Sequence, residues 1–284
     1  MSWPTWDQAV VAAVVSALVA VAARRWRDAP VGSAVGSAAR ELTLIASLYA
    51  LWQAAHLLPL AHDQGAIARA RQIVTIEHDL HLPTELSLQR LVLAHDWLGR
   101  ATSLYYGVMH VPALIGFIVW LFVRQRAHYP RWRNGLVAVT GGSLLIRFVR
   151  VAPPRFLADL GYIDLSERFG PSIYGPVGTG VSDQFAAMPS IHVGWAAVVG
   201  LGALVASRSR WRWLVVLHLP LTILVVSASG HHWWLDGAVA IGLLGIGLVA
   251  DSQVRRLATA MSARRTAPTV GTSPPVDDPQ PALA

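Results

Sequence analysis

The stretch Gly230-His231-His232-Trp233-Trp234-Leu235-Asp236 stands directly before an apolar run that we place at residues 236–251. A second stretch of this kind, Pro189-Ser190-Ile191-His192, opens an apolar run over residues 191–207. Imidazole groups are costly at a membrane boundary unless they have a partner or a task. The two stretches therefore predict neighbouring membrane helices that share one site at the membrane surface.

The composition indicates an integral membrane protein. The 284 residues are 54% hydrophobic and 14% charged, whereas soluble domains average about 25% charged residues. Several apolar segments approach the ~20 residues that cross ~30 Å of hydrocarbon as a helix. We place them at residues 8–23, 41–60, 103–123, 135–151, 191–207, 213–229 and 236–251. The expected fold class is all-α, a polytopic transmembrane helical bundle of about six to seven spans.

The basic residues argue for orientation signals. All 23 are arginine, and the net charge is +7. They fall in short clusters between apolar runs and not along one polar face, so we predict no nucleic-acid binding. The absence of lysine and cysteine excludes Schiff-base, thiolate and disulfide chemistry. The arginine bias, with abundant Ala, Val and Gly, is typical of a GC-rich genome, and we expect a bacterial plasma membrane.

Arginine counts predict the topology. If loops 24–40, 124–134 and 208–212 and the tail after residue 251 face the cytoplasm, they carry most of the arginines, and far fewer lie on the other side. Those on the cytoplasmic side are Arg24, Arg25, Arg27, Arg40, Arg124, Arg126, Arg131, Arg133, Arg208, Arg210, Arg212, Arg255, Arg256, Arg264 and Arg265. The N-terminus is then outside and the C-terminus is cytoplasmic. This topology puts both histidine stretches at the outer face.

The remaining parts of the chain are assigned by composition. The first apolar segment is preceded by Asp7 and by no basic residue, so we expect an uncleaved helix and not a signal peptide. Residues 1–40 are expected to form this N-terminal transmembrane helix and a cytoplasmic loop, and residues 41–255 a helical core. Residues 256–284, rich in proline towards their end, are expected to be a disordered cytoplasmic tail.

Residues 64–99 differ from the apolar runs. Hydrophobic positions recur there at near-helical spacing among charged ones, which predicts interfacial amphipathic helices that roof a site or shape lipid entry. Glu77, Asp79 and Glu85 lie in this stretch, and we interpret them as a solvated face in preference to a metal site. No metal and no cofactor are predicted.

The two histidine stretches carry groups suited to phosphoryl transfer. His232 and Asp236 are four residues apart, so on a helix the carboxylate reaches one ring nitrogen and leaves the other free as nucleophile or base. Ser190 and His192 stand at a helix N-terminus, where free N–H groups favour an anion. Arg155, in Ala152-Pro153-Pro154-Arg155, offers a planar fork for phosphate oxygens. One histidine could attack phosphorus while the other protonates the leaving alkoxide.

These motifs resemble a known family. PSxH followed by HxxxD between membrane helices, with an upstream basic motif, is similar to the type 2 phosphatidic acid phosphatase superfamily. The APPR form, with PSIHVGW and GHHWWLD, is most similar to the branch that contains inositol phosphorylceramide synthases. So are Tyr105-Tyr106-x3-His110 and the stretch Glu77…Glu85…Gln89. The resemblance covers roughly residues 40–251, and thus makes the helical core the phosphatase/phosphotransferase unit.

The resemblance implies a role for each motif residue. His232 would be the nucleophile that forms a phosphohistidine, and Asp236 its orienting partner. His192 would be the general acid and then the general base, while Arg155 and Ser190 would bind the phosphate. The lysine and arginine usual in the superfamily are replaced here by Phe148 and Val226. The phosphate clamp is therefore expected to use other groups, Arg150 and His231.

Several other polar and aromatic residues are open to more than one interpretation. His231 is equally a phosphate contact, a support for the contacting side chains, or an interfacial residue. His110, with Tyr106, lines the substrate or simply lies at the interface, and Arg147 faces the site or snorkels outward. His218 is expected to bind carbonyls freed at the Pro220 kink. The expected aromatic belt consists of Trp195, Trp233 and Trp234.

The predicted function is that of a lipid phosphotransferase at the outer membrane face. The resemblance favours transfer of a phosphoryl-containing head group, with a lipid phosphate as donor, membrane lipids as surroundings and a polyol such as inositol as acceptor. The alternative is hydrolysis of phosphatidate or a polyprenyl phosphate. A carrier or haem protein, and a superfamily member that has lost activity, are the alternatives from other classes.

Overall fold

The computed structural model describes residues 5–56, 65–146, 148–170 and 184–266, and within them the regular structure is helical. The predicted all-α class is confirmed. The only extended pairing in these residues is one isolated bridge between Val151 and Ala186. The elements are α1 (Trp6–Ala22), η1 (Ala23–Trp26), α2 (Pro30–His56), α3 (Ala66–Asp79), α4 (Glu85–Leu93), α5 (Asp96–Val108), α6 (His110–Arg124), α7 (Tyr129–Ile146), η2 (Pro154–Phe156), η3 (Ala158–Leu160), α8 (Leu165–Phe169), α9 (Ile191–Ala206), α10 (Arg212–Val216), α11 (His218–Ala228) and α12 (Trp234–Thr266).

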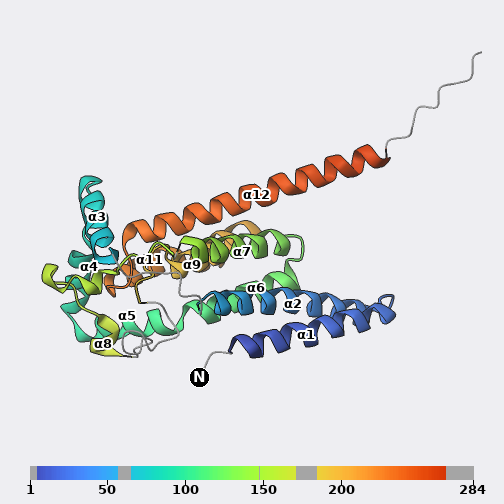
Figure 1. Ribbon diagram of the computed structural model, residues 1–284, viewed down its shortest axis with the longest axis horizontal. Helices are drawn as coiled ribbons and strands as arrows, with labels where there is room; N and C mark the ends of the chain where they lie inside the picture. Colours follow the sequence, from blue (N-terminus) through green and yellow to red (C-terminus); the bar gives the residue numbers. More distant parts are fainter. Residues whose placement is uncertain (1–4, 57–64, 147, 171–183, 267–284) are drawn as a thin grey trace, which may run out of the picture.

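The helices divide into a long bundle and a cluster at one end (Figure 1). α1 and α2 form an antiparallel pair along one side, and α12 runs along the other. The short helices α3, α4 and α8, with α5, gather at the end where α12 begins. The opposite end of the bundle holds the connection between α1 and α2 and the far end of α12.

α9 lies at the centre of the bundle and packs against α6, α7, α10, α11 and α12. Two of its glycines allow this. A Cβ on Gly202 would lie 2.4 Å from the Phe117 ring, and one on Gly194 would lie 2.5 Å from Val139. In a membrane, small residues bring helices close enough to gain packing contacts that the apolar solvent does not otherwise drive. The packed core therefore depends on glycine at both positions.

Fewer helices qualify as membrane spans than the sequence predicts. Two are long and apolar enough, Trp6–Trp26 and Trp234–Ser262, and α5 with α6 makes a third if this pair, bent by 47°, is one span. α9 and the α10–α11 segment are apolar but shorter than a span. Within the described residues the expected six to seven spans are thus corrected to two or three, and breaks at Met109 and Leu217 divide two of the apolar runs.

Two predicted boundaries also change. Residues 30–40, expected to belong to a loop, are the first turns of α2. The tail expected from residue 256 is helical as far as Thr266, and its remainder lies outside the described residues. Hydropathy did not predict the start of α2 or the end of α12. Whether a helix continues beyond its apolar run is set by helix propensity and packing.

Candidate functional site

Three loops meet where α12 begins, and backbone hydrogen bonds hold them together. The amide of Val151 donates to the carbonyl of Phe185 at 2.8 Å, and the amide of Ala187 donates back to Val151 at 3.1 Å. The amide of Arg155 donates to the carbonyl of Gly230 at 2.9 Å. Segments that carry Arg155, Ser190 and the histidine pair are therefore fixed relative to one another by the main chain.

Gly230 and Trp233 complete this framework. Gly230 has φ +79°, and a Cβ there would lie 2.6 Å from the carbonyl oxygen of Ile163, so the turn requires glycine. The indole N–H of Trp233 donates to the carbonyl of Ala152 at 2.9 Å, and the side chain is 1% exposed. Trp233 therefore belongs to the core beneath the site, not to the predicted aromatic belt.

The imidazoles of His192 and His232 face each other. Nδ1 of His192 lies 3.2 Å from Nε2 of His232. His232 Nδ1 contacts two acceptors, the carbonyl of Ala187 at 2.8 Å and Oδ2 of Asp236 at 3.3 Å. Since the carbonyl of Ala187 can only accept, Nδ1 carries the proton, and Nε2 presents its lone pair towards His192.

Burial keeps His232 neutral. Its pKa is lowered to about 4, chiefly by desolvation; the bond to the Ala187 carbonyl opposes this shift, and the positive charge of Arg155 adds to it. The side chain is 6% exposed. At neutral pH its Nε2 is therefore unprotonated, which is the state a nucleophile needs.

Asp236 is held by the backbone as well as by the histidine. Its side chain is fully buried, and Oδ2 accepts the amide of Trp233 at 2.9 Å. Its carbonyl oxygen accepts the amide of Ser190 at 3.1 Å, which joins α12 to the start of α9. The Ser190 hydroxyl caps α9 by accepting the amide of Val193 at 3.3 Å.

Arg155 and His231 lie on either side of an aspartate. Arg155 Nε is 3.3 Å from Oδ2 of Asp164, and His231 Nε2 is 3.6 Å from Oδ1. His231 Nδ1 contacts the hydroxyl of Ser229 at 2.9 Å. Desolvation and the Arg155 charge lower the pKa of His231. The sequence analysis did not identify Asp164. The local signal for this residue is that it caps the start of α8.

Tyr106 and His110 lie inside the site and not at the bundle surface. The Tyr106 ring stacks on His231, with centroids 4.3 Å apart and an interplanar angle of 24°, and is 4.8 Å from the ring of His192. The His110 ring is 4.7 Å from the His192 ring. Both nitrogens of His110 are buried and have no hydrogen-bond partner among the described residues.

Glu77 and Glu85 correct the expectation of a solvated face. They are 5% and 2% exposed, while Asp79 alone of the three is exposed. Glu77 Oε1 accepts the amide of Leu235 at 2.9 Å, and Glu85 Oε1 accepts the amide of Trp234 at 3.0 Å. These are amides at the start of α12, which have no partner within the helix.

The two carboxyl groups also bond to each other. Desolvation, with the hydrogen bond and charge of Glu85, raises the pKa of Glu77 to about 9, and desolvation raises the pKa of Glu85 as well. A pair of this kind holds one proton between two carboxyls. The Tyr162 hydroxyl donates to Glu85 Oε2 at 3.4 Å. The amphipathic helices α3 and α4 thus deliver a buried carboxyl pair to the start of α12.

The outcomes differ for His218, Arg150 and Arg147. His218 Nδ1 contacts the Tyr105 hydroxyl at 2.6 Å, so its partner is a side chain and not a kink carbonyl. The Arg150 carbonyl accepts Arg69 Nε at 2.6 Å, and a phosphate role for its side chain stays a prediction. Arg147 lies outside the described residues.

Trp195 and Trp234, which the sequence placed in the aromatic belt, both donate hydrogen bonds. Trp195 is half-buried, and its indole N–H donates to the Thr140 hydroxyl at 3.3 Å. The indole N–H of Trp234 donates to the carbonyl of Pro83 at 2.6 Å. Across the part of the chain that the structure describes, no group of three His, Cys, Asp or Glu side chains is arranged to hold a metal ion.

Comparison with known proteins identifies the family. The family model described as the PAP2 superfamily matches residues 71–250. This match covers more than half of the chain, and the chain therefore belongs to the PAP2 superfamily. No curated protein and no solved structure matches it. The predicted superfamily is confirmed, while the match does not extend to a branch within it.

Proposed function

We propose that this member of the PAP2 superfamily transfers a phosphoryl-containing group of a membrane lipid through a phosphohistidine on His232. One observation carries the proposal. His232 Nδ1 is bound by acceptors on Ala187 and Asp236, while Nε2 faces His192 at 3.2 Å. A histidine nucleophile needs this arrangement, with one nitrogen fixed as a donor and the other directed at the reacting atom.

The reaction proceeds in two balanced steps. The phosphoryl group enters between the two imidazoles, which move apart, and His232 Nε2 forms a bond to phosphorus as the bond to the leaving oxygen breaks. The leaving oxygen takes a proton from His192, which enters this step as the imidazolium and ends it as the neutral imidazole. In the second step His192 takes a proton from the acceptor hydroxyl, whose oxygen attacks phosphorus and releases His232. Arg155 balances the negative charge of the phosphoryl oxygens throughout.

The acceptor separates two versions of this function. The first is transfer to a polyol such as inositol, and it rests on the likeness of the APPR and GHHWWLD stretches to the inositol phosphorylceramide synthase branch. The second is transfer to water, which makes the protein a phosphatase of phosphatidate or a polyprenyl phosphate. Both versions share the same phosphohistidine and the same two steps.

The proposed orientation puts this chemistry at the outer face of a plasma membrane. The arginine clusters lie near the far ends of α1, α6 and α12 and at the starts of α7 and α10, and the site lies at the other end of the bundle (Figure 1). Positive loops stay on the cytoplasmic side. The N-terminus is then outside, the C-terminus is cytoplasmic and the site faces outward.

The test uses the purified protein with phosphate-labelled phosphatidate, with and without inositol. We expect an acid-labile phosphoprotein in the wild type, and loss of at least ~10³-fold in turnover in His232→Ala. His78→Ala serves as the control because this histidine is exposed on α3, at 82% of its side-chain surface. Equal turnover by His232→Ala and wild type would refute the proposal, and free phosphate without an inositol product would eliminate the transferase version.

A further inference from the structure

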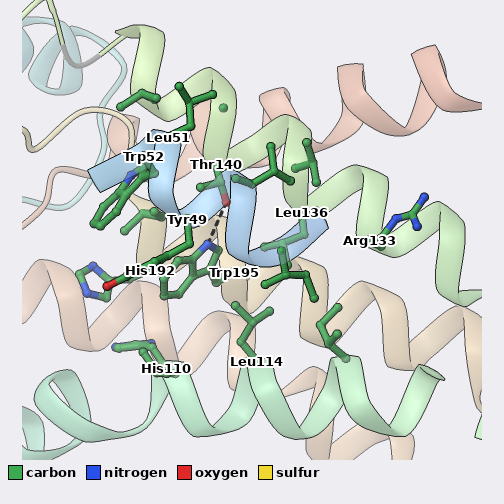
Figure 2. Close-up of a pocket in the computed structure, with 18 of the residues that line it drawn as sticks. Tyr49, Leu51, Trp52, His110, Leu114, Arg133, Leu136, Thr140, His192 and Trp195 are labelled. Atoms are coloured by element: carbon green, nitrogen blue, oxygen red, sulfur yellow. Dashed lines mark hydrogen bonds between the residues drawn. The ribbon is translucent and has the colours of Figure 1, made fainter. Parts of the chain in front are cut away.

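A cavity runs from the candidate site along the bundle. It has a volume of about 480 Å³ and lies among α2, α6, α7 and α9, within the range of ~300–1,000 Å³ typical of ligand pockets. At one end it is lined by His192 and His110, and at the other by Arg133 (Figure 2). The cavity is therefore continuous with the reacting histidines.

The wall between these ends is apolar. Leu114 of α6, Leu136 of α7 and Trp195 of α9 lie between the histidines and Arg133 (Figure 2). The lining along α7 extends from Arg133 to Leu144, which is about 16 Å at 1.5 Å per residue. This shape fits an extended alkyl chain better than a head group, which would need polar partners along the wall.

An ion pair closes the far end. Arg133 Nη1 lies 2.7 Å from Glu41 Oε1, and the Tyr129 hydroxyl donates to Glu41 at 3.1 Å. A methyl terminus gains nothing from such a group and would have to desolvate it to pass. The ion pair thus sets a depth limit.

The near end offers a polar contact that no protein group uses. His110 is 4% exposed, and neither ring nitrogen has a hydrogen-bond partner among the described residues. A buried polar group left unpaired is costly unless a ligand supplies the partner. The ester or hydroxyl oxygens between the phosphate and the chain of a lipid stand at the right position to supply it, because His110 lies beside His192.

We propose that this cavity binds one alkyl chain of the lipid phosphate, with His110 at the polar backbone of the lipid and the Glu41–Arg133 pair at the chain end. This inference rests on the proposed function. α2 supplies one wall, including Tyr49 and Trp52, and lies before the family-matched residues 71–250. The chain site is therefore built from helices within the family-matched residues together with α2, which precedes them.

The cavity is expected to fix the position of the lipid and not to raise the affinity for it. The bilayer interior is as apolar as the cavity wall, so moving a chain from lipid to protein releases little free energy. A chain held along α7 instead fixes the phosphorus between the two histidines. Blocking the cavity should accordingly lower kcat for long chains more than it raises KM.

Gly141 allows a clean block. It lines the cavity, and a Cβ built there meets nothing within 4 Å. Gly116 of α6 is equally free of contacts but does not line the cavity, so Gly116→Phe is the matched control. We expect Gly141→Phe to lower kcat at least tenfold on dioleoyl phosphatidate and less than twofold on dibutanoyl phosphatidate. Equal losses on both substrates, or equal behaviour of the two variants, would overturn the proposal.

A binding readout separates this inference from the proposed function. A long-chain phosphatidate with a diazirine at the chain terminus is crosslinked to the full-length protein in detergent, and the adducts are mapped. We expect adducts on α7 near Leu136 and on α2 near Leu44, also in inactive His232→Ala. Adducts spread over the outer face of α1 would contradict the cavity as chain site. Mapped adducts in a wild-type protein that shows no turnover of lipid phosphates would instead remove the proposed function and keep the chain site.

Discussion

The two ends of the bundle hold their carboxyl groups in opposite ways. At the arginine-rich end the partners are side chains, and Glu41 faces Arg133 at 2.7 Å while Asp251 accepts from Arg255 at 2.7 Å. Asp251 also accepts the amide group of the Asn134 side chain at 2.6 Å. The Glu41–Arg133 pair ties α2 to α7, and the bond from the neutral Asn134 side chain to Asp251 ties α12 to α7.

At the site end three buried carboxyls have backbone amides as partners, while Asp164 pairs with the Arg155 side chain. Asp236, Glu85 and Glu77 accept the amides of residues 233, 234 and 235 in turn. The amides at the start of a helix carry a partial positive charge and need acceptors, and three buried carboxyls satisfy them. The site end thus fixes its main chain with acids, and in the proposed function His192 and His232 face the substrate.

The largest effect should come from the arginine of the site. Arg155→Lys removes the planar fork, and we expect kcat/KM on phosphatidate to fall by about 10²–10³-fold. Arg255→Lys at the other end is the control and should keep wild-type kcat/KM, since Arg255 pairs with Asp251 of the same helix, outside the site. Steady-state kinetics of both variants measure the difference. Equal activity of Arg155→Lys and wild type would remove Arg155 from the phosphate site.

The next effect concerns the acids at the start of α12. Glu85→Ala leaves the buried amide of Trp234 without its acceptor, which costs about 1–3 kcal/mol, and shifts His232 away from its partner on α12. We expect kcat to fall about tenfold with little change in KM. Glu85→Gln keeps an oxygen for the amide and should restore most of kcat. If the glutamine variant is as slow as the alanine variant, Glu85 does not act by positioning α12.

The shared proton of this carboxyl pair predicts a pH dependence of stability. The pKa of Glu77 is raised from its ordinary value of 4.5 to about 9, so between these values the folded protein keeps a proton that the unfolded chain has released. The free energy of unfolding must therefore fall as the pH rises through this window. Thermal unfolding between pH 5 and 9 measures it, and Glu77→Gln should flatten the curve. A parallel decline in wild type and variant would assign the dependence to another group.

The smallest effect is expected at the arginine-rich end. The Arg255 side chain is 51% exposed, and buried Asp251 keeps its hydrogen bond from Asn134 when Arg255 is removed. A partly exposed pair of this kind contributes about 0–1 kcal/mol. Arg255→Ala should lower the unfolding temperature slightly, and less in high salt, with unchanged turnover. A loss of turnover in this variant would show that the arginine-rich end affects the reaction, contrary to this expectation.

Local sequence was sufficient for the motifs because their partners are close along the chain. His232 and Asp236 are one helical turn apart, so their contact follows from spacing. Ser190 caps the helix that His192 enters, as its residue type at that position predicts. Hydropathy likewise predicted an all-α membrane protein, although not where its helices break, since a break depends on the packing of neighbouring helices.

Other parts of the site depended on the tertiary structure. The acceptor closest to His232 is the carbonyl of Ala187, which any residue type could supply and which therefore leaves no mark in the sequence. The periodicity of residues 64–99 showed a polar helix face, but water and the buried amides of α12 favour the same residue types. Only folding decided between them, by placing Glu77 and Glu85 where the first amides of α12 lack partners.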